Sequence, residues 1–320
     1  MCIPWNRLRG YLQLGGVDRL ATGALVLATV LWAGSFIAMK LAIDVYGPMF
    51  VVFARLVLAS GCLLLLVGRF KSERYQRGDW KLLLFMALCE PCLYFVCEGL
   101  ALTYTSASQA GMIVALLPLM VAVSAWVVLK ERLRPKTWFG FLLAISGVIW
   151  LTLLSESTES APNPMLGNFL EFLAMCCATG SMIALKKLCT RFSPLFLTTV
   201  QAFVGCIFFL PILFFPGTPL PDSFHLGAVL SILYLGIGVT IVAYWLYNFG
   251  ISRIPAGQAS IFVNLIPVIT LFLGWLILGE RLVPLQYAAS LLVLAGVFLS
   301  QGSQTPPRSV PVTVKPRPRQ

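Results

Sequence analysis

The chain has 320 residues, of which 59% are hydrophobic and 11% are charged, and its formal net charge is +11. Because about 25% of the residues of a soluble domain are charged, this composition excludes a soluble globular protein and predicts an integral membrane protein. The Lys and Arg residues are spread between apolar runs, as membrane orientation requires, so a nucleic-acid partner is not predicted.

Apolar runs of membrane-spanning length follow one another along the chain. A helix of about 20 residues crosses about 30 Å of hydrocarbon, and the runs lack the polar-apolar alternation of membrane β-barrel strands. The first run is longer than the apolar region of about 7–15 residues in a secretory signal, so we expect no signal peptide. We predict an all-α membrane protein with ten transmembrane helices. These cover approximately residues 21–43, 48–69, 80–102, 106–129, 136–154, 165–188, 194–216, 225–247, 255–278 and 284–301.

The loops between these runs differ in charge. If the N-terminus lies in the cytoplasm, twenty of the 23 Lys and Arg residues lie in cytoplasmic segments. The opposite loops are neutral or acidic, as in "SESTESAPNP" (155–164). The positive-inside rule therefore predicts a multi-pass protein of the cell inner (plasma) membrane with both termini cytoplasmic.

The chain contains an internal repeat. Residues 107–148 match residues 256–297 at a constant offset of 149, and "AGSFIAMK" (33–40) matches "TGSMIALK" (179–186). Because a five-helix unit has an odd number of crossings, its second copy must be inverted, which is typical of alternating-access transporters. The predicted parts are a cytoplasmic leader (1–20), repeat 1 (21–154), an external linker (155–164), repeat 2 (165–301) and a disordered basic cytoplasmic tail (302–320).

Several motifs carry a family resemblance. They are "LWAGSFIAMK" (31–40), "ARLVLA" (54–59), "ALTYTSASQAGMIVALLPLMVA" (101–122), "LKERL" (129–133) and "IPAGQASIFVNLIPVITLFLGWLILGERL" (254–282). In this order they resemble the drug/metabolite transporter (DMT) superfamily, in its EamA-type branch of ten-helix carriers. The resemblance implies a secondary transporter, often an exporter of amino acids or other small metabolites, with a central cavity between two five-helix bundles.

Five ionisable side chains fall inside the predicted helices. A charge at the bilayer centre costs about 2.5–3.5 kcal/mol on insertion scales, so each such side chain needs a partner, a cavity or a changed protonation state. Four share the external half, where either ion pairs (Arg55–Glu98 or Lys40–Glu171) form a gate or the side chains contact substrate. Lys40 has the further option of extending to the interface. The five are Lys40, Arg55, Glu90, Glu98 and Glu171.

Glu90 is expected near the midplane, about 15 Å from the start of its helix. No cationic side chain is expected at its depth, and a carboxyl group buried without a partner is readily protonated. This suggests a proton-coupling site or an anchor for a substrate amine. The alternative is a protonated Glu90 bonded to a carbonyl that Pro91 frees. Tyr94 lies four residues on and therefore on the same helix face.

Other candidates are uncharged. Pro118 and Pro267 are repeat mates halfway along their helices, and we expect them to kink those helices as hinges or to free cavity-facing carbonyls. Asn264 offers a hydrogen-bonding side chain at a similar depth. Trp32 and Tyr244 are candidate cavity aromatics, with packing as the alternative role.

The leading function is a secondary exporter of small metabolites such as amino acids or amphiphilic amines, with proton coupling left open. The alternatives are a nucleotide-sugar or phosphorylated-metabolite exchanger and a non-transport membrane protein such as a scramblase. An enzyme is not predicted, because nine scattered Cys and one His make no metal or catalytic constellation. No cofactor is expected. The sequence contains no Walker motif, so an ATP-driven motor is not predicted. Expected partners are a small-molecule substrate and membrane lipid, with protons and a homodimer as open alternatives.

Overall fold

The computed structural model describes residues 19–65, 75–129, 135–188, 191–216, 218, 220–251, 253 and 262–301. Within these ranges the chain forms helices and connecting turns, and no strand. Seven helical segments are long and apolar enough to cross a membrane, and three shorter apolar helices accompany them. The predicted all-α membrane class is confirmed. The leader, most of the first basic loop and the tail lie outside the described residues.

The helices follow the predicted runs in order. The bounds are α2 (Arg19–Tyr46), α3 (Pro48–Leu64), α4 (Asp79–Ala87), η2 (Leu88–Leu93), α5 (Tyr94–Tyr104), α6 (Ala107–Val114), α7 (Leu117–Leu129), α8 (Pro135–Leu153), α9 (Pro164–Leu188), α10 (Pro194–Ile212), α11 (Leu226–Leu233), η3 (Tyr234–Ala243), α12 (Tyr244–Ile251), α14 (Leu265–Ile277) and α15 (Pro284–Gln301). The segments η2 and η3 are π-helical.

Prolines explain where several predicted helices are interrupted. Glu90 has an extended backbone (φ −146°, ψ 118°) because it precedes Pro91, and a proline disfavours helical geometry in the residue before it. The segment α6 ends at Val114 and α7 begins at Leu117, directly before Pro118. The helix α14 likewise starts two residues before Pro267. At these breaks, in the middle of the predicted helices, the backbone departs from regular α-helical geometry.

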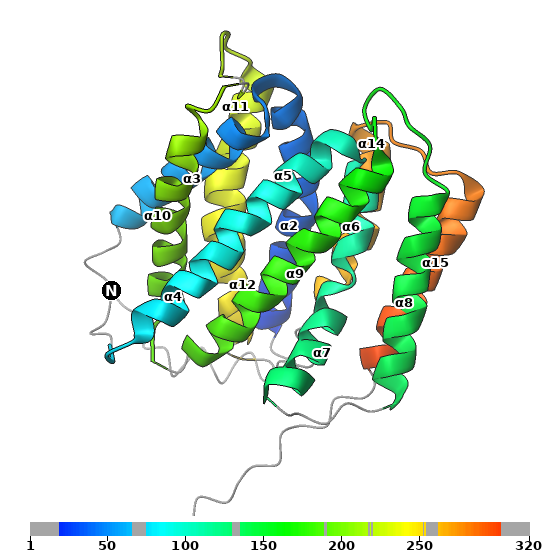
Figure 1. The fold of residues 1–320 in the computed structure, drawn as a ribbon, viewed down its shortest axis with the longest axis horizontal. Helices are drawn as coiled ribbons and strands as arrows, with labels where there is room; N and C mark the ends of the chain where they lie inside the picture. The colour runs from blue at the N-terminus through cyan, green and yellow to red at the C-terminus, as the bar shows by residue number, and fades with distance from the viewer. Residues whose placement is uncertain are drawn as a thin grey trace, which may run out of the picture.

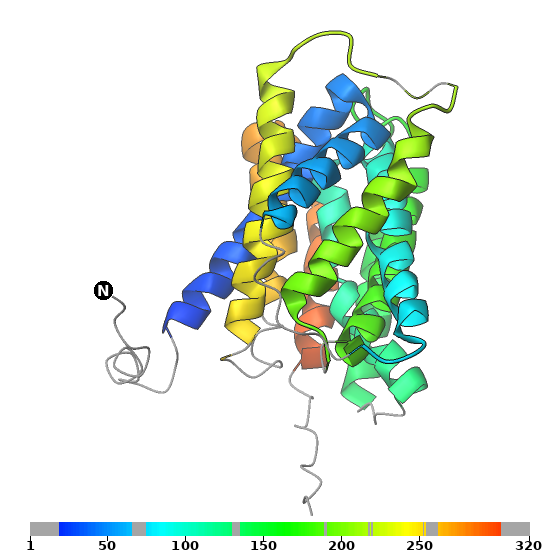
Figure 2. The ribbon, with the colours of Figure 1, turned by 90° about the vertical axis from the view of Figure 1, so that its left-hand side faces the viewer.

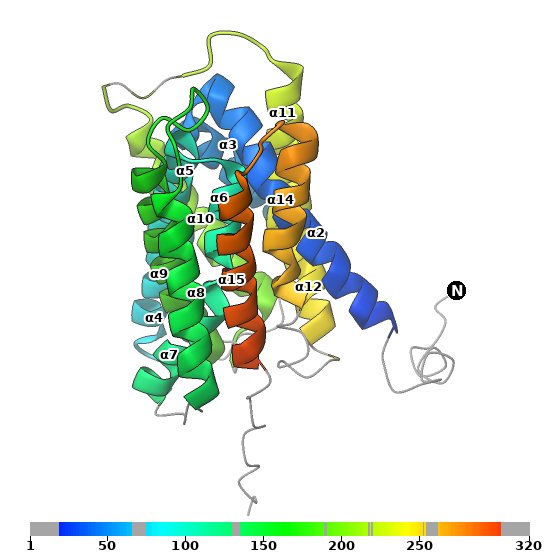
Figure 3. The ribbon, with the colours of Figure 1, turned by 90° about the vertical axis from the view of Figure 1, so that its right-hand side faces the viewer.

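The helices form one tilted bundle (Figure 1). The segments α4, α5 and α9 cross its front, with α5 packed along α9. The pair α3 and α10 lies at one edge with α11 nearby, and Figure 2 faces this edge. The pair α8 and α15 lies at the other edge, which Figure 3 faces. The described chain begins and ends toward the same end of the bundle.

Small residues bring α8 and α15 into direct backbone contact. A Cβ atom on Gly140 would lie 2.5 Å from the carbonyl oxygen of Gly296, and one on Gly147 would lie 3.0 Å from the carbonyl oxygen of Ala289. The paired positions run in opposite directions, so the two helices are antiparallel. Close approach through glycine is a common means of association between membrane helices, because lipid offers little hydrophobic driving force.

Replacing Gly147 by leucine should force these two helices apart. The new side chain would meet the backbone nitrogen of Val293 at 2.8 Å, and such overpacking costs about 1–3 kcal/mol. Thermal unfolding in detergent should therefore occur at a lower temperature than in the wild type. The matched control is Gly23→Leu on α2, where a Cβ meets no atom within 4 Å. Equal melting temperatures for the two variants would contradict the tight contact.

Candidate functional site

Ionisable side chains from separate helices gather inside the bundle. Arg55, Glu98 and Glu171 are 4%, 5% and 0% exposed. Electrostatic interactions link Arg55 to Glu98, Glu90, Tyr94 and Tyr244, and link Glu98 to Glu171. The structure thus brings together most of the residues that the sequence singles out. Lys40 lies elsewhere, bonded to backbone carbonyl oxygens.

Glu90 is held by side chains from the second half of the chain. The hydroxyl of Tyr244 donates a hydrogen bond of 2.9 Å to the Glu90 carboxylate. The side-chain amide of Gln201 donates one of 2.8 Å to the Glu90 backbone carbonyl. Ser181 also hydrogen-bonds the carboxyl group, and Arg55 acts on it electrostatically. The expectation that Glu90 lacks a partner and a nearby cation is therefore wrong, because residues distant in sequence supply both.

A small cavity of about 30 Å³ adjoins Glu90. Since about 10–15 Å³ of such volume holds one water molecule, water fits beside the carboxyl group. The walls come from α3, η2, α5, α10, η3 and α12, and include Phe95, Gln201, Thr240 and Tyr244. Glu90, which is partly buried, lies next to space that a water or a small polar group can occupy.

The guanidinium group of Arg55 lies over the ring of Phe95, 4.4 Å from its centroid. Its Nη2 donates a hydrogen bond of 3.2 Å to the hydroxyl of Thr240, while its Nε has no hydrogen-bond partner. Among the described residues its attraction to Glu98 is electrostatic and involves no hydrogen-bonded contact. The predicted Arg55–Glu98 pair is thus present only as neighbouring opposite charges.

Lys40 does not pair with Glu171. Its ammonium group is buried and donates to three backbone carbonyl oxygens, of Leu102 at 2.6 Å, Thr105 at 3.2 Å and Ser160 at 2.5 Å. The last carbonyls of a helix have no intrahelical partner, and Lys40 bonds two at the end of α5, those of Leu102 and Thr105. It also bonds the carbonyl of Ser160 in the 155–163 loop. It also does not extend to an interface, since it is 3% exposed.

Glu280 is a hydrogen-bond acceptor at the start of α6, whereas Lys40 is a donor at the end of α5. Its carboxylate accepts hydrogen bonds from the backbone nitrogens of Ala107 (2.8 Å) and Ser108 (2.9 Å), and from the Ser108 hydroxyl at 2.5 Å. A carboxylate at a helix N-terminus satisfies unpaired N–H groups and interacts favourably with the helix dipole. Glu280 therefore caps the start of α6.

Glu280→Ala should destabilise the protein, because three donors at the start of α6 lose their acceptor. An unsatisfied buried donor costs about 1–3 kcal/mol. The unfolding temperature in detergent should fall clearly below that of Glu159→Ala, which removes an exposed carboxylate from the 155–163 loop. The cap would be unimportant if both variants unfolded at the wild-type temperature.

Glu171 and Asn264 are among the buried polar side chains of the described residues that have no hydrogen-bond partner. Neither carboxylate oxygen of Glu171 and neither amide atom of Asn264 is bonded, although the residues are 0% and 1% exposed. Nearby, the hydroxyl of Tyr94 donates a hydrogen bond of 2.7 Å to Glu98. Because buried polar groups are nearly always hydrogen-bonded, each unpaired group of this kind requires an explanation, such as a bound proton.

Aromatic side chains surround the Tyr244 side of the cluster. Trp32 lies 5.4 Å from Tyr244 and 4.9 Å from Tyr247, measured between ring centroids. Both tyrosines belong to α12. The neighbouring Trp245 of α12 is instead 62% exposed on the outside of the bundle.

Sequence reasoning missed four neutral polar residues, which are Ser181, Gln201, Thr240 and Tyr247. Gln201 carries a detectable signal, because a glutamine in the middle of an apolar helix is expensive unless it is bonded inside the bundle. Thr and Ser give no such signal, since they are common in membrane helices. In the described part of the chain no group of three His, Cys, Asp or Glu side chains has the arrangement of a metal site.

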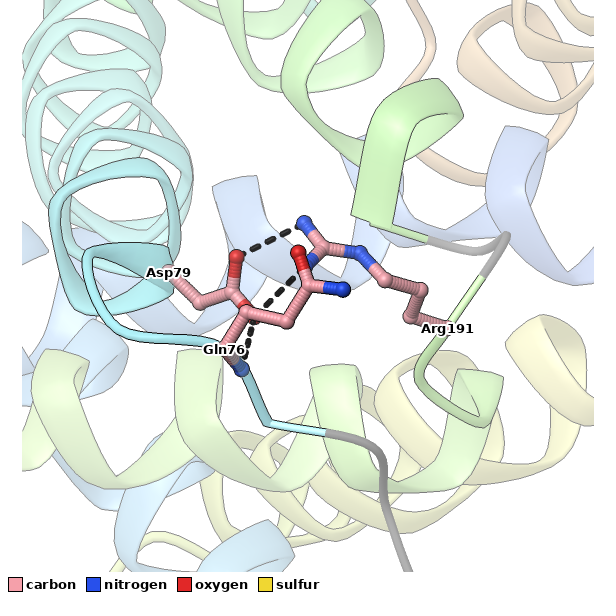
Figure 4. A network of polar contacts seen from close by, with 3 residues as sticks. All are labelled: Gln76, Asp79 and Arg191. Carbon is pink, nitrogen blue, oxygen red and sulfur yellow. Dashed lines mark hydrogen bonds and ion pairs between the residues drawn. The ribbon is translucent and has the colours of Figure 1, made fainter.

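A separate ion pair lies at the end of the bundle where α4 begins. Arg191 contacts Asp79 at 2.7 Å and 2.9 Å, and the backbone nitrogen of Gln76 donates to the same carboxylate at 2.8 Å (Figure 4). Arg191 is partly exposed, so the pair resembles a surface salt bridge. It ties the start of α4 to the turn after α9 and lies apart from the buried cluster.

Comparisons with known proteins agree with a membrane carrier. Residues 20–153 and 165–301 each match the model of the EamA-like transporter family. The chain is 24% identical to the "Uncharacterized transporter YetK" of Bacillus subtilis (strain 168), over 93% of this chain and 90% of the relative. It is 30% identical to the "Uncharacterized transporter YcxC" of the same organism, over 82% and 86%.

Two further similarities concern function and fold separately. The chain is 25% identical to the "Probable terminal-alkyne amino-acid exporter" of Streptantibioticus cattleyicolor, over 87% of this chain and 92% of the relative. One crystal structure superposes with a TM-score of 0.59 at 18% identity, over 88% of this chain and 97% of the other. At that identity the structural likeness shows the fold alone.

Proposed function

The chain belongs to the EamA-like transporter family, and from this premise we propose that it is a secondary active transporter that exports small metabolites by alternating access with proton coupling. As a multi-pass membrane protein of a transporter family it acts on a small molecule in a lipid environment. The substrate class that we propose is amino acids and amphiphilic amines, and we assign it no enzymatic reaction.

The observation that carries this proposal is the charge balance of the buried cluster. Three carboxyl groups, those of Glu90, Glu98 and Glu171, share it with one guanidinium group, that of Arg55. Ionised carboxylates inside a membrane need compensation by protons or by a cationic ligand. A substrate ammonium group and a proton are both suitable, and each could be exchanged for the other.

The surroundings of Glu90 favour an amine with an apolar part. The carboxyl group adjoins the small cavity, and Trp32 and Tyr244 lie close to its position. Aromatic faces attract ammonium groups and also bury apolar surface. The name of the relative from Streptantibioticus cattleyicolor, an amino-acid exporter, supports the same class of substrate.

A phosphorylated substrate is less well supported. Phosphate recognition relies on Arg and Lys side chains that are free to make charge-assisted hydrogen bonds. Lys40 is already bonded to three carbonyl oxygens, and Arg55 lies among carboxyl groups. Nucleotide-sugar and phosphorylated-metabolite exchange therefore remains the second candidate only.

Alternating access rests on two inverted five-helix repeats, residues 21–154 and 165–301, and this division is part of the proposal. The α8–α15 contact supports it, because the offset of 149 residues converts Gly140 to Ala289 and Gly147 to Gly296, and so exchanges the two contacts. The start of α2 and the end of α15 lie toward the same end of the bundle (Figure 1), which supports an even number of crossings.

We further propose that both termini are cytoplasmic and that the protein lies in the inner (plasma) membrane. The start of α4, the start of α8 and the end of α9 lie at the same end of the bundle (Figure 1). They carry Lys81, Lys136 and Lys187, in accordance with the positive-inside rule.

The proposal is tested by counterflow in proteoliposomes. Vesicles that contain purified protein are preloaded with one unlabelled amino acid, amphiphilic amine or phosphorylated metabolite at a time, and uptake of the labelled compound is measured. We expect saturable uptake for a member of the amine-bearing group. We also expect substrate export to be faster when a proton gradient is imposed across the vesicle membrane. Saturable exchange of phosphorylated compounds alone would favour the second candidate. Phospholipid flipping without solute exchange would favour a scramblase.

A further inference from the structure

Two buried glutamates lie at the same level of the seam between α5 and α9. Gly167 of α9 packs against Ala101 of α5, because a Cβ added to this glycine would lie 2.9 Å from the Ala101 carbonyl oxygen. The two helices run in opposite directions (Figure 1). Glu171, one turn beyond Gly167, therefore falls about one turn before Ala101, at the level of Glu98. The electrostatic interaction between the two carboxyl groups agrees with this register.

Glu171 is sealed from water. It is 0% exposed, so no void large enough for a water molecule touches its side chain, and neither carboxylate oxygen accepts a hydrogen bond. A hydrated ion or an ammonium group requires space beside the oxygens, and none is present. A proton is the cation that needs no such space. It also removes the charge that burial makes costly.

The groups around Glu171 do not supply a compensating cation. Tyr94, Cys97 and Glu98 of α5 interact with it electrostatically. The neighbouring segment η2 adds Glu90 and two cysteines nearer the basic end. The segment α6 and the described α7 contain no ionisable residue, while those of α4 and α8 lie at the helix starts, and Lys187 lies at the end of α9. The groups that face Glu171 are thus acidic or neutral.

We propose that Glu171 is a second proton-binding site of the transporter, formed with Glu98 and separate from Glu90. This rests on the proposed proton-coupled function. The proton binds to a carboxylate oxygen of Glu171 and leaves it for water, and no other bond changes. In the conformation described, Glu90 adjoins a cavity and can exchange its proton, whereas Glu171 cannot. Glu171 exchanges only when the seam between α5 and α9 opens during the transport cycle.

The first test is infrared spectroscopy of purified protein without substrate. A protonated carboxyl group gives a carbonyl stretch that an ionised carboxylate lacks. We expect the spectrum of the wild type minus that of Glu171→Gln to contain this band at neutral pH, with slow exchange in heavy water. The spectrum of the wild type minus that of Glu159→Gln, the exposed-loop control, should contain no such band. Absence of the band from the Glu171 difference spectrum overturns the site.

The second test measures coupling in proteoliposomes with a substrate that the wild type transports. Each coupled proton contributes about a tenfold accumulation per pH unit. At a gradient of one pH unit, Glu171→Gln should therefore accumulate about tenfold less substrate than the wild type. Glu171→Met, of similar length and without polar atoms, provides a second variant if the glutamine does not fold.

The two tests separate the possible failures. If the wild type transports nothing, the proposed function fails, and the infrared result still decides whether Glu171 holds a proton. If the band is present and both Glu171 variants accumulate as much substrate as the wild type, the proton is structural and the coupling role is overturned.

Discussion

Glu90→Gln is expected to slow proton-driven transport strongly while the protein still folds. A glutamine oxygen can accept the 2.9 Å hydrogen bond from Tyr244, and the backbone bond from Gln201 is unaffected. The amide cannot take up or release a proton, so the proton exchanged at Glu90 should no longer drive substrate movement. We expect the rate under a proton gradient to fall by at least about tenfold, equivalent to about 1.4 kcal/mol.

Two further variants serve as controls for this prediction. Glu159→Gln removes an exposed carboxylate and should leave transport unchanged. Tyr244→Phe removes the donor to Glu90 and should shift the pH profile without eliminating it, because the carboxyl group remains. An unchanged rate and an unchanged pH profile in Glu90→Gln would end the coupling role for Glu90, provided that the variant elutes as a single species in detergent.

The sequence predicts the helices well because hydropathy and proline are local signals. Each predicted run contains at least one helix of the structure, and the interruptions occur next to Pro91, Pro118 and Pro267. The predicted hinge role of these prolines stays a prediction. The runs at 48–69 and 255–278 extend into residues that the structure does not describe, so their full lengths are untested.

The partners of the buried charges could not be predicted in the same way. Sequence gives the depth of a side chain in the membrane, and it does not give the direction in which that side chain faces. The sequence places Lys40 and Glu171 in the same half of the membrane, yet Lys40 faces carbonyl oxygens at the end of α5. Tyr244 contacts Glu90 across 154 residues of sequence, and only the fold brings them together.

Intramembrane ionisable groups nevertheless predict which residues lie together, although their functional roles stay a prediction. The cost of burying a charge singled out Arg55, Glu90, Glu98 and Glu171, and the structure places all of them in one interacting cluster. Neutral members such as Gln201 and Thr240 were missed, because their types are less costly in a membrane. Energetic cost is therefore a better guide to location than to pairing.

Arg55→Met should be the most destabilising of the substitutions considered. It removes the one guanidinium group that interacts with Glu98 and Glu90, and it also removes the packing on Phe95. Loss of one partner from a buried set of charges costs about 3–5 kcal/mol, because the remaining charges are uncompensated. We expect a large fall in unfolding temperature in detergent, or loss of folded protein. Arg191→Met is the matched control, and its partly exposed pair with Asp79 should cost at most about 1 kcal/mol.

The double variant Arg55→Met with Glu98→Gln decides whether charge is the cause. Replacing a buried charged pair by neutral side chains of similar size is often neutral in stability, so the second substitution should restore part of what the first removes. If the effects of the two substitutions simply add, Arg55 stabilises the bundle through its contact with Phe95 and its hydrogen bond to Thr240. Recovery would show that the cluster tolerates its carboxyl groups because Arg55 is there. It would then follow that any cation exchanged at Glu90 must compete with a charge already in place.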